Sequence, residues 1–149
     1  MKIWIDADAC PRGIKDIVFR AAERLHIHTI MVANQPLHTP RSKWITSRVV
    51  SKGFDVADEH ILDEVDPEDI VITQDIPLAA EVIEKGAVAI SLQGELYTAS
   101  NIRQRLSVRN FLDDMRNAGV TTGGPAPFGN QQKQRFAGTL DRLLAKRKK

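Results

Sequence analysis

The chain has 149 residues, of which 42% are hydrophobic and 27% charged, and this composition is typical of a single globular domain spanning residues 1–149. Its sequence holds no apolar run of the roughly 18–20 residues that a membrane span needs, and a single cysteine excludes both an internal disulfide and a zinc site built of thiolates. Because Asp6 and Asp8 interrupt the apolar N-terminus, we expect no signal peptide and predict a cytoplasmic location without a membrane partner.

The formal net charge of +2 conceals two halves of opposite sign. Residues 1–100 carry 10 Lys and Arg against 16 Asp and Glu, whereas residues 101–149 carry 11 against 3. This asymmetry predicts a carboxylate region suited to a metal ion beside a surface that attracts phosphate. The alternative is two solvated faces that only neutralise each other.

The first predicted element is an apolar strand that runs into Asp6 and Asp8 and stops at Pro11, which can open a helix. Residues two apart on a strand point to the same face, so we expect both carboxylates at the carboxyl end of the strand. Such a pair suits a hard cation, Mg²⁺ or Mn²⁺. The alternative is that one aspartate caps the next helix and the other is solvated.

Apolar residues at helical spacing predict a helix over residues 12–24. Cys10 precedes it, and we favour a small buried or capping residue over a catalytic thiol there. A branched apolar run then predicts a strand over residues 28–33, followed by a loop at Asn34, and we expect a helix over residues 43–51. The four histidines show no metal-ligand spacing.

Asp58 is predicted to start a helix, where it would either cap that helix or add a carboxylate to the cluster, and capping is favoured. The apolar run over residues 70–73 predicts a strand that delivers Asp75, followed by a helix to Glu84 that closes at Gly86. After a further strand over residues 87–90, the alternation of strands and helices indicates an α/β fold with a mainly parallel sheet. In such a sheet Asp75 should lie at the same edge as the first two aspartates.

The last third of the chain does not continue this regular alternation of strands and helices. Residues 96–115 predict one helix or two, residues 119–129 a long loop rich in glycine and proline, and residues 131–144 a final helix. Residues 146–149 form a basic tail that we interpret as solvated and disordered.

Four motifs together resemble a known family: residues 4–11 (WIDADACP), 33–36 (ANQP), 70–79 (IVITQDIPLA) and 123–125 (GGP). They are similar to the YaiI/YqxD family of uncharacterised bacterial proteins, over nearly the whole chain. That family is grouped with PIN-like domains, which implies a Rossmann-like α/β/α sandwich and relationship to metal-dependent ribonucleases.

The resemblance implies a set of roles for residues in this chain. Asp6, Asp8 and Asp75 correspond to the strand-end aspartates that hold Mg²⁺ or Mn²⁺ in PIN-like nucleases, and Asp58 falls in their middle acidic motif. The chain departs from some relatives that carry another aspartate a few positions after Asp75, because Ile76, Pro77 and Leu78 occupy that region here.

The leading hypothesis is therefore a metal-dependent nuclease, with RNA favoured over DNA as its substrate. The bound ion would activate water at the scissile phosphate. Arg103 and Arg109 would contact flanking phosphates, and Asn34 and Thr73 would orient a water or a ligand oxygen.

Two other functions are compatible with the sequence. The Asp-x-Asp motif also opens phosphatases of the haloacid-dehalogenase type, although the Thr or Val usual two residues after the second aspartate is replaced here by Cys10. Alternatively, the chain is a nucleic-acid- or partner-binding module without turnover, which the basic last third fits equally well. The oligomeric state is not indicated.

Overall fold

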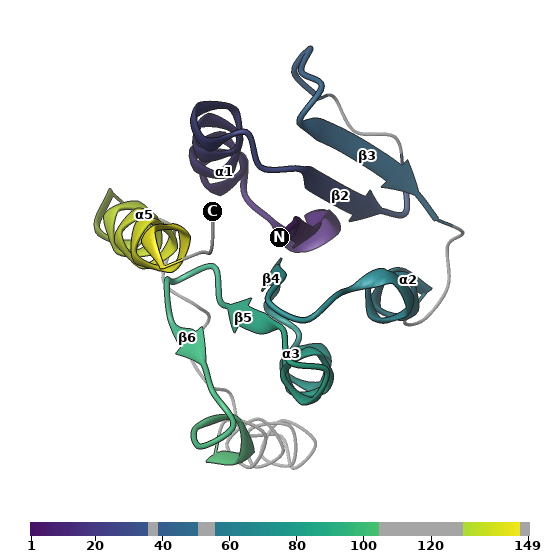
Figure 1. Cartoon of the computed structure of the whole chain (residues 1–149), viewed down its shortest axis with the longest axis vertical. Helices are drawn as coiled ribbons and strands as arrows, with labels where there is room; N and C mark the ends of the chain where they lie inside the picture. The colour runs from purple at the N-terminus through teal and green to yellow at the C-terminus, as the bar shows by residue number, and fades with distance from the viewer. Residues whose placement is uncertain (36–38, 51–55, 105–129, 147–149) are drawn as a thin grey trace, which may run out of the picture.

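The computed structural model describes residues 1–35, 39–50, 56–104 and 130–146 (Figure 1). Their centre is a six-stranded sheet with the order β3-β2-β1-β4-β5-β6. The first five strands are parallel and β6 runs antiparallel to β5. The strands are β1 (Ile3–Asp6), β2 (Thr29–Ala33), β3 (Ile45–Val49), β4 (Ile70–Ile72), β5 (Val88–Ile90) and β6 (Leu96–Tyr97).

Helices cover both faces of the sheet, so the predicted three-layer α/β/α arrangement is confirmed (Figure 1). On one face lie α1 (Arg12–Leu25) and α5 (Asn130–Ala145), and on the other lie α2 (Val56–Glu64) and α3 (Ile76–Glu84). A short 3₁₀ helix, η1 (Ala7–Ala9), joins β1 to α1. No helix of the described residues is both long and apolar enough to cross a membrane.

Strand β1 shows why the sheet is buried on both sides. Ile3 and Ile5 pack with Phe136 in one core cluster, whereas Trp4 between them belongs to the opposite cluster with Leu78. Successive strand residues point to opposite faces, so a strand covered on both faces must be apolar throughout.

At the amino edge of the parallel strands, the buried carboxylate of Asp69 ties β1 to β4. It accepts hydrogen bonds from the backbone N–H of Lys2 at 2.9 Å, from Trp4 Nε1 at 3.1 Å and from the backbone N–H of Asp66 at 2.9 Å. Because β1 and β4 are held in register here, their carboxyl ends meet at the opposite edge.

The prediction of a helix over residues 43–51 is wrong, because residues 45–49 form the edge strand β3. Only Ile45 of this strand is buried, so the segment lacks the apolar alternation that identifies a strand. Its β-branched residues nevertheless favour extended structure, and β3 pairs along its whole length with β2.

The predicted helical start at Leu96 is also wrong. Leu96 and Tyr97 form the two-residue strand β6, and helical structure begins only at residue 102. A strand this short carries no periodic signal, and it is defined by its pairing with Ala89 and Ile90.

Asp58 does not start its helix, because α2 begins at Val56 and places Asp58 in its first turn. The predictions for residues 105–115, the loop over 119–129 and tail residues 147–149 fall outside the described residues. The helices after Pro11 and Asp75, the strands over β2, β4 and β5 and the final helix are confirmed, with ends shifted by one or two residues.

Candidate functional site

Segments that leave three neighbouring strands meet at the carboxyl edge of the sheet. Asp6 is the last residue of β1, Asn34 follows β2 directly, and Thr73 follows β4 directly. Since β1 pairs in parallel with both β2 and β4, these residues share one edge. This is the edge at which open α/β sheets bind their ligands.

Thr73 links two of the predicted aspartates. Its side chain is almost completely buried, and its hydroxyl donates a hydrogen bond to Asp6 Oδ2 at 3.1 Å while accepting one from the backbone N–H of Asp75 at 3.0 Å. Asp75 in turn caps α3, because its Oδ1 accepts a hydrogen bond from the backbone N–H of Leu78 at 3.1 Å. Through these hydrogen bonds, Thr73 fixes the position of the Asp6 carboxylate relative to the backbone of Asp75 at the start of α3.

Asp8 and Asn34 form a second contact at this edge. Asp8 lies in η1 with its side chain exposed, and its Oδ2 accepts a hydrogen bond from the backbone N–H of Asn34 at 2.9 Å. The side-chain Oδ1 of Asn34 is buried and has no hydrogen-bond partner among the described residues. A buried oxygen without a partner costs free energy, so it marks a place for a water or a cation.

The electrostatics of the site centre on Asp6. Burial raises the pKa of the Asp6 carboxyl above its ordinary value, and the nearby carboxylates of Asp75 and Asp8 raise this pKa further. The hydrogen bond from Thr73 opposes the rise. A cation beside these carboxylates would favour their charged forms and reverse the effect.

The described side chains supply only part of a coordination shell. Within the described ranges, no group of three or more His, Cys, Asp or Glu side chains is arranged to hold a metal ion. Mg²⁺ commonly keeps several waters and needs only one or two carboxylates from the protein.

The remaining predicted site residues are not all brought to this edge. Asp58 lies in α2 at a position whose side chain is outside the described part, and Arg109 is likewise outside it. Arg103 is exposed and follows β6, which β4 and β5 separate from β1, so it is not placed beside the carboxylates.

Lys133 of α5 is a cation near this edge that sequence reasoning missed. Its Nζ lies 3.0 Å from the position that a Cβ would occupy at Gly13, in the first turn of α1. The lysine side chain thus lies over Gly13, and the separation of 120 residues hides this contact in the sequence.

Cys10 is a buried member of the core, as favoured from the sequence. Burial raises the pKa of its thiol to about 12, and the nearby Asp6 also raises this pKa. A thiol that stays protonated at neutral pH does not act as a nucleophile.

The fold and this edge define an α/β protein with a mainly parallel sheet whose strand ends gather carboxylate, hydroxyl and amide groups. The family described as "Uncharacterized BCR, YaiI/YqxD family" matches residues 4–146, and the chain belongs to this family. The resemblance noted in the sequence is thereby confirmed at the level of the family.

The chain is similar over its full length to proteins named UPF0178 protein. It is 61% identical to that of Marinomonas sp. (strain MWYL1) over 149 residues, which is 100% of both chains. It is 58% identical to that of Dechloromonas aromatica (strain RCB) over 146 residues, covering 98% of this chain and 97% of the relative. No solved structure matches the chain.

Proposed function

We propose that this protein is a Mg²⁺- or Mn²⁺-dependent phosphodiesterase that cleaves RNA at the carboxyl edge of its sheet. The observation that carries the proposal is the buried, unpartnered Oδ1 of Asn34, a residue whose backbone N–H bonds Asp8, at the edge where Thr73 links Asp6 to Asp75. Oxygen donors of this kind are the ligands that hard divalent ions prefer.

We propose that Asp6 holds the ion together with one further carboxylate, Asp8 or Asp75, while waters complete the coordination shell, and that Asp58 is a further candidate. The ion, when bound, would lower the pKa of a coordinated water and neutralise charge on the scissile phosphate. The raised pKa of Asp6 supports this assignment. Burial is its main cause and the carboxylates of Asp75 and Asp8 add to it, so a cation beside Asp6 would favour the charged form.

The residues around the aspartates would orient them. Thr73 donates to one oxygen of Asp6 and so leaves the other available to a ligand. Asn34 would add its Oδ1 directly or through water. Lys133 would contact a phosphate next to the one that is cleaved; its ammonium lies at the first turn of α1 and forms no ion pair with the described residues.

The test is cleavage of a fluorescent single-stranded RNA with Mn²⁺, comparing wild type with Asp6→Asn. We expect the variant to lose activity by about 100-fold or more, and to bind Mn²⁺ more weakly in calorimetry. Asp16→Asn is the matched control, because it removes an exposed carboxylate of α1 with the same change of charge. The control should cleave as wild type does.

Thr73 provides a second, independent variant. Thr73→Val removes the hydrogen bonds to Asp6 and Asp75 and should reduce cleavage by about 10–100-fold, whereas Thr73→Ser should restore it. The proposal is wrong if wild type leaves RNA intact with both ions, or if Asp6→Asn cleaves as fast as wild type. RNA affinity that depends on salt, without cleavage and without an effect of Asp6→Asn, would instead support a binding module.

A further inference from the structure

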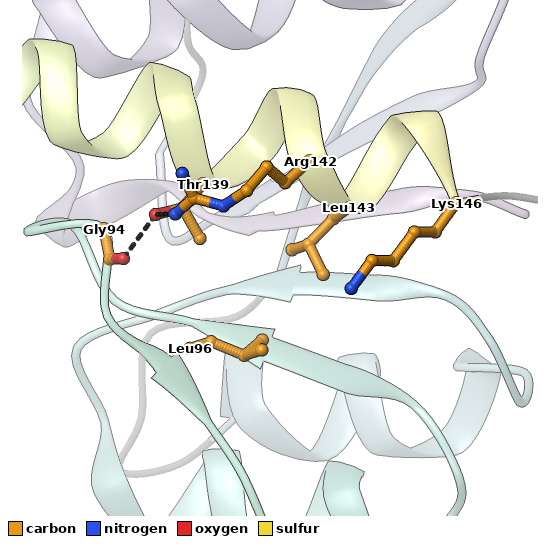
Figure 2. A pocket seen from close by; sticks show the side chains of 6 residues that line it. All are labelled: Gly94, Leu96, Thr139, Arg142, Leu143 and Lys146. Atoms are coloured by element: carbon orange, nitrogen blue, oxygen red, sulfur yellow. Dashed lines mark hydrogen bonds between the residues drawn. The ribbon is translucent and has the colours of Figure 1, made fainter.

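A pocket of about 160 Å³ lies between α5 and the turn that joins β5 to β6, and none of the predicted site aspartates lines it (Figure 2). Its walls combine two cations, two leucines and a hydrogen-bonded threonine. The lining residues are Gly94, Leu96, Thr139, Arg142, Leu143 and Lys146.

One rim of the pocket is held rigidly. The buried hydroxyl of Thr139 donates to the carbonyl oxygen of Gly94 at 2.7 Å and accepts from Arg142 Nη2 at 3.1 Å. Gly94 has a φ of +83°, and a Cβ there would lie 2.8 Å from the backbone of Arg135. The turn therefore packs closely against α5, and the hydrogen bond to Thr139 holds the guanidinium of Arg142 in place before any ligand binds.

The pocket is positively charged. Arg142 lies in the last turn of α5 and Lys146 directly follows the helix, four residues further on, so the two lie on the same side, and Figure 2 shows their side chains on either side of Leu143. No carboxylate lines the pocket, and neither cation has an acidic partner among the described residues. Two like charges at this spacing repel each other, and a bound anion would offset the repulsion.

The size and charge of the pocket select the kind of anion. It is smaller than the roughly 300–1,000 Å³ of pockets that enclose a whole ligand, so a complete nucleotide does not fit. A phosphate group with its ester carbons does fit, and a phosphate monoester carries about −1.5 to −2 charges at neutral pH, which matches two cations. Leu96, which is 37% exposed, and Leu143 offer apolar contact to the sugar carbons.

We infer that this pocket binds the terminal phosphate monoester of an RNA chain, held by Arg142 and Lys146. The choice of RNA as the carrier rests on the proposed function, whereas the recognition of the phosphate rests on the pocket itself. The sheet order separates β6 from β1 by two strands, so the chain end would be anchored apart from the proposed cleavage site.

The test compares one RNA sequence in three forms: with a 5′-phosphate, with a 3′-phosphate and with hydroxyls at both ends. Affinities are measured in EDTA on the Asp6→Asn background, so that no cleavage intervenes. We expect one phosphorylated form to bind at least about 5-fold more tightly than the hydroxyl form, as expected for charge-assisted hydrogen bonds.

The double variant Arg142→Gln/Lys146→Gln should abolish this preference. The matched control Arg20→Gln/Arg135→Gln removes two exposed cations outside the pocket, and it should weaken all three RNAs alike while keeping the preference. Equal affinity for all three RNAs, or a preference that survives the double variant, overturns the inference.

A titration with ribose 5-phosphate against ribose separates this inference from the proposed function. If no RNA is bound or cleaved but ribose 5-phosphate binds, and binding is lost in the double variant, the phosphate pocket stands without the nuclease. If RNA is cleaved but neither ribose 5-phosphate nor the phosphorylated chain ends are preferred, the nuclease stands without the pocket. Failure of wild type to bind ribose 5-phosphate at millimolar concentration, together with no preference among the RNAs, overturns the pocket.

Discussion

At the scale of single residues, burial and neighbouring carboxylates both disfavour the charged form of Asp6 at the carboxyl edge. The fold buries most of the Asp6 carboxyl and places Asp75 and Asp8 near it, which raises the pKa of Asp6. Without a cation, the Asp6 carboxyl is therefore protonated more readily in the folded protein than in the unfolded chain. Groups with such conflicts concentrate at functional sites, because a ligand can relieve them.

The conflict predicts how stability depends on pH. The pKa of Asp6 is raised in the folded state, so the folded protein binds the proton more tightly and loses stability as pH rises from the ordinary aspartate pKa through the raised one. Asp6→Asn has no such loss. In EDTA, we expect the difference in Tm, taken as Asp6→Asn minus wild type, to increase from about pH 4 to about pH 7. Each change of 1 kcal/mol in the free energy of unfolding corresponds to about 3 °C in Tm.

Thermal melts across this pH range check the prediction, with Asp16→Asn as the control that follows wild type. A Tm difference that is constant or decreases with pH would contradict it. If the proposed site binds Mn²⁺, the ion should raise the Tm of wild type at neutral pH and raise that of Asp6→Asn much less, because the variant should bind the ion more weakly.

At the scale of elements, the turn between β5 and β6 connects the sheet to α5. Gly94 combines a positive φ with close packing against the backbone of Arg135 and Phe136, and Thr139 bonds its carbonyl oxygen. This short turn thus determines both the position of α5 over the sheet and the shape of the phosphate pocket.

Gly94→Ala should therefore be strongly destabilising. The added Cβ would meet backbone atoms that cannot move aside, and the left-handed conformation would be strained, at a combined cost of about 2–4 kcal/mol. Gly138→Ala is the matched control, since its nearest described neighbour is Arg142 Nη1 at 3.8 Å and alanine favours the helix by about 0.5–1 kcal/mol. Denaturant unfolding should rank the stabilities as Gly138→Ala, wild type and Gly94→Ala, from highest to lowest, and similar values for the two variants would refute this account.

At the scale of the whole molecule, the acidic and basic halves of the chain meet in three dimensions. Helix α5, from the basic last third, packs beside α1, which follows the first aspartates. Lys133 reaches the first turn of α1, whereas Asp141 forms an ion pair with Arg24 near its end. Cations of the last third are thereby brought toward the carboxyl edge where a phosphate backbone would be cleaved.

This arrangement predicts the salt dependence of RNA binding. Affinity for single-stranded RNA should fall with salt, with a slope of log affinity against log salt of about −0.7 for each phosphate contact. Lys133→Gln/Arg135→Gln should reduce the slope by up to about 1.4, whereas Arg20→Gln/Arg41→Gln, which removes exposed cations from the acidic half, should change it little. Affinity measured in EDTA at several salt concentrations tests this, and equal slopes for both double variants would exclude a role for α5.

The sequence by itself determined the elements that have a strong local signal. Fully apolar strands such as β2 and β4, and amphipathic helices such as α1, were predicted because burial dictates their residue pattern. The repeated order of strand, aspartate and helix placed Asp6 and Asp75 at one edge, since parallel strands share their direction. The sequence analysis missed the edge strands β3 and β6. Only one residue of β3 is buried and β6 has only two residues, so neither strand carries a clear periodic signal.

Only the tertiary structure decided which side chains meet. The hydrogen bond between Thr73 and Asp6 spans 67 residues, and the buried Oδ1 of Asn34 has meaning only once its surroundings are known. The strand order separates β6, which Arg103 follows, from β1 by two strands, and the packing of α5 brings Lys133 to the first turn of α1. Thr139 links Arg142 to Gly94 through hydrogen bonds. The physical reason is that local patterns report burial and backbone preference, whereas a site depends on contacts between segments that strand order and helix packing bring together.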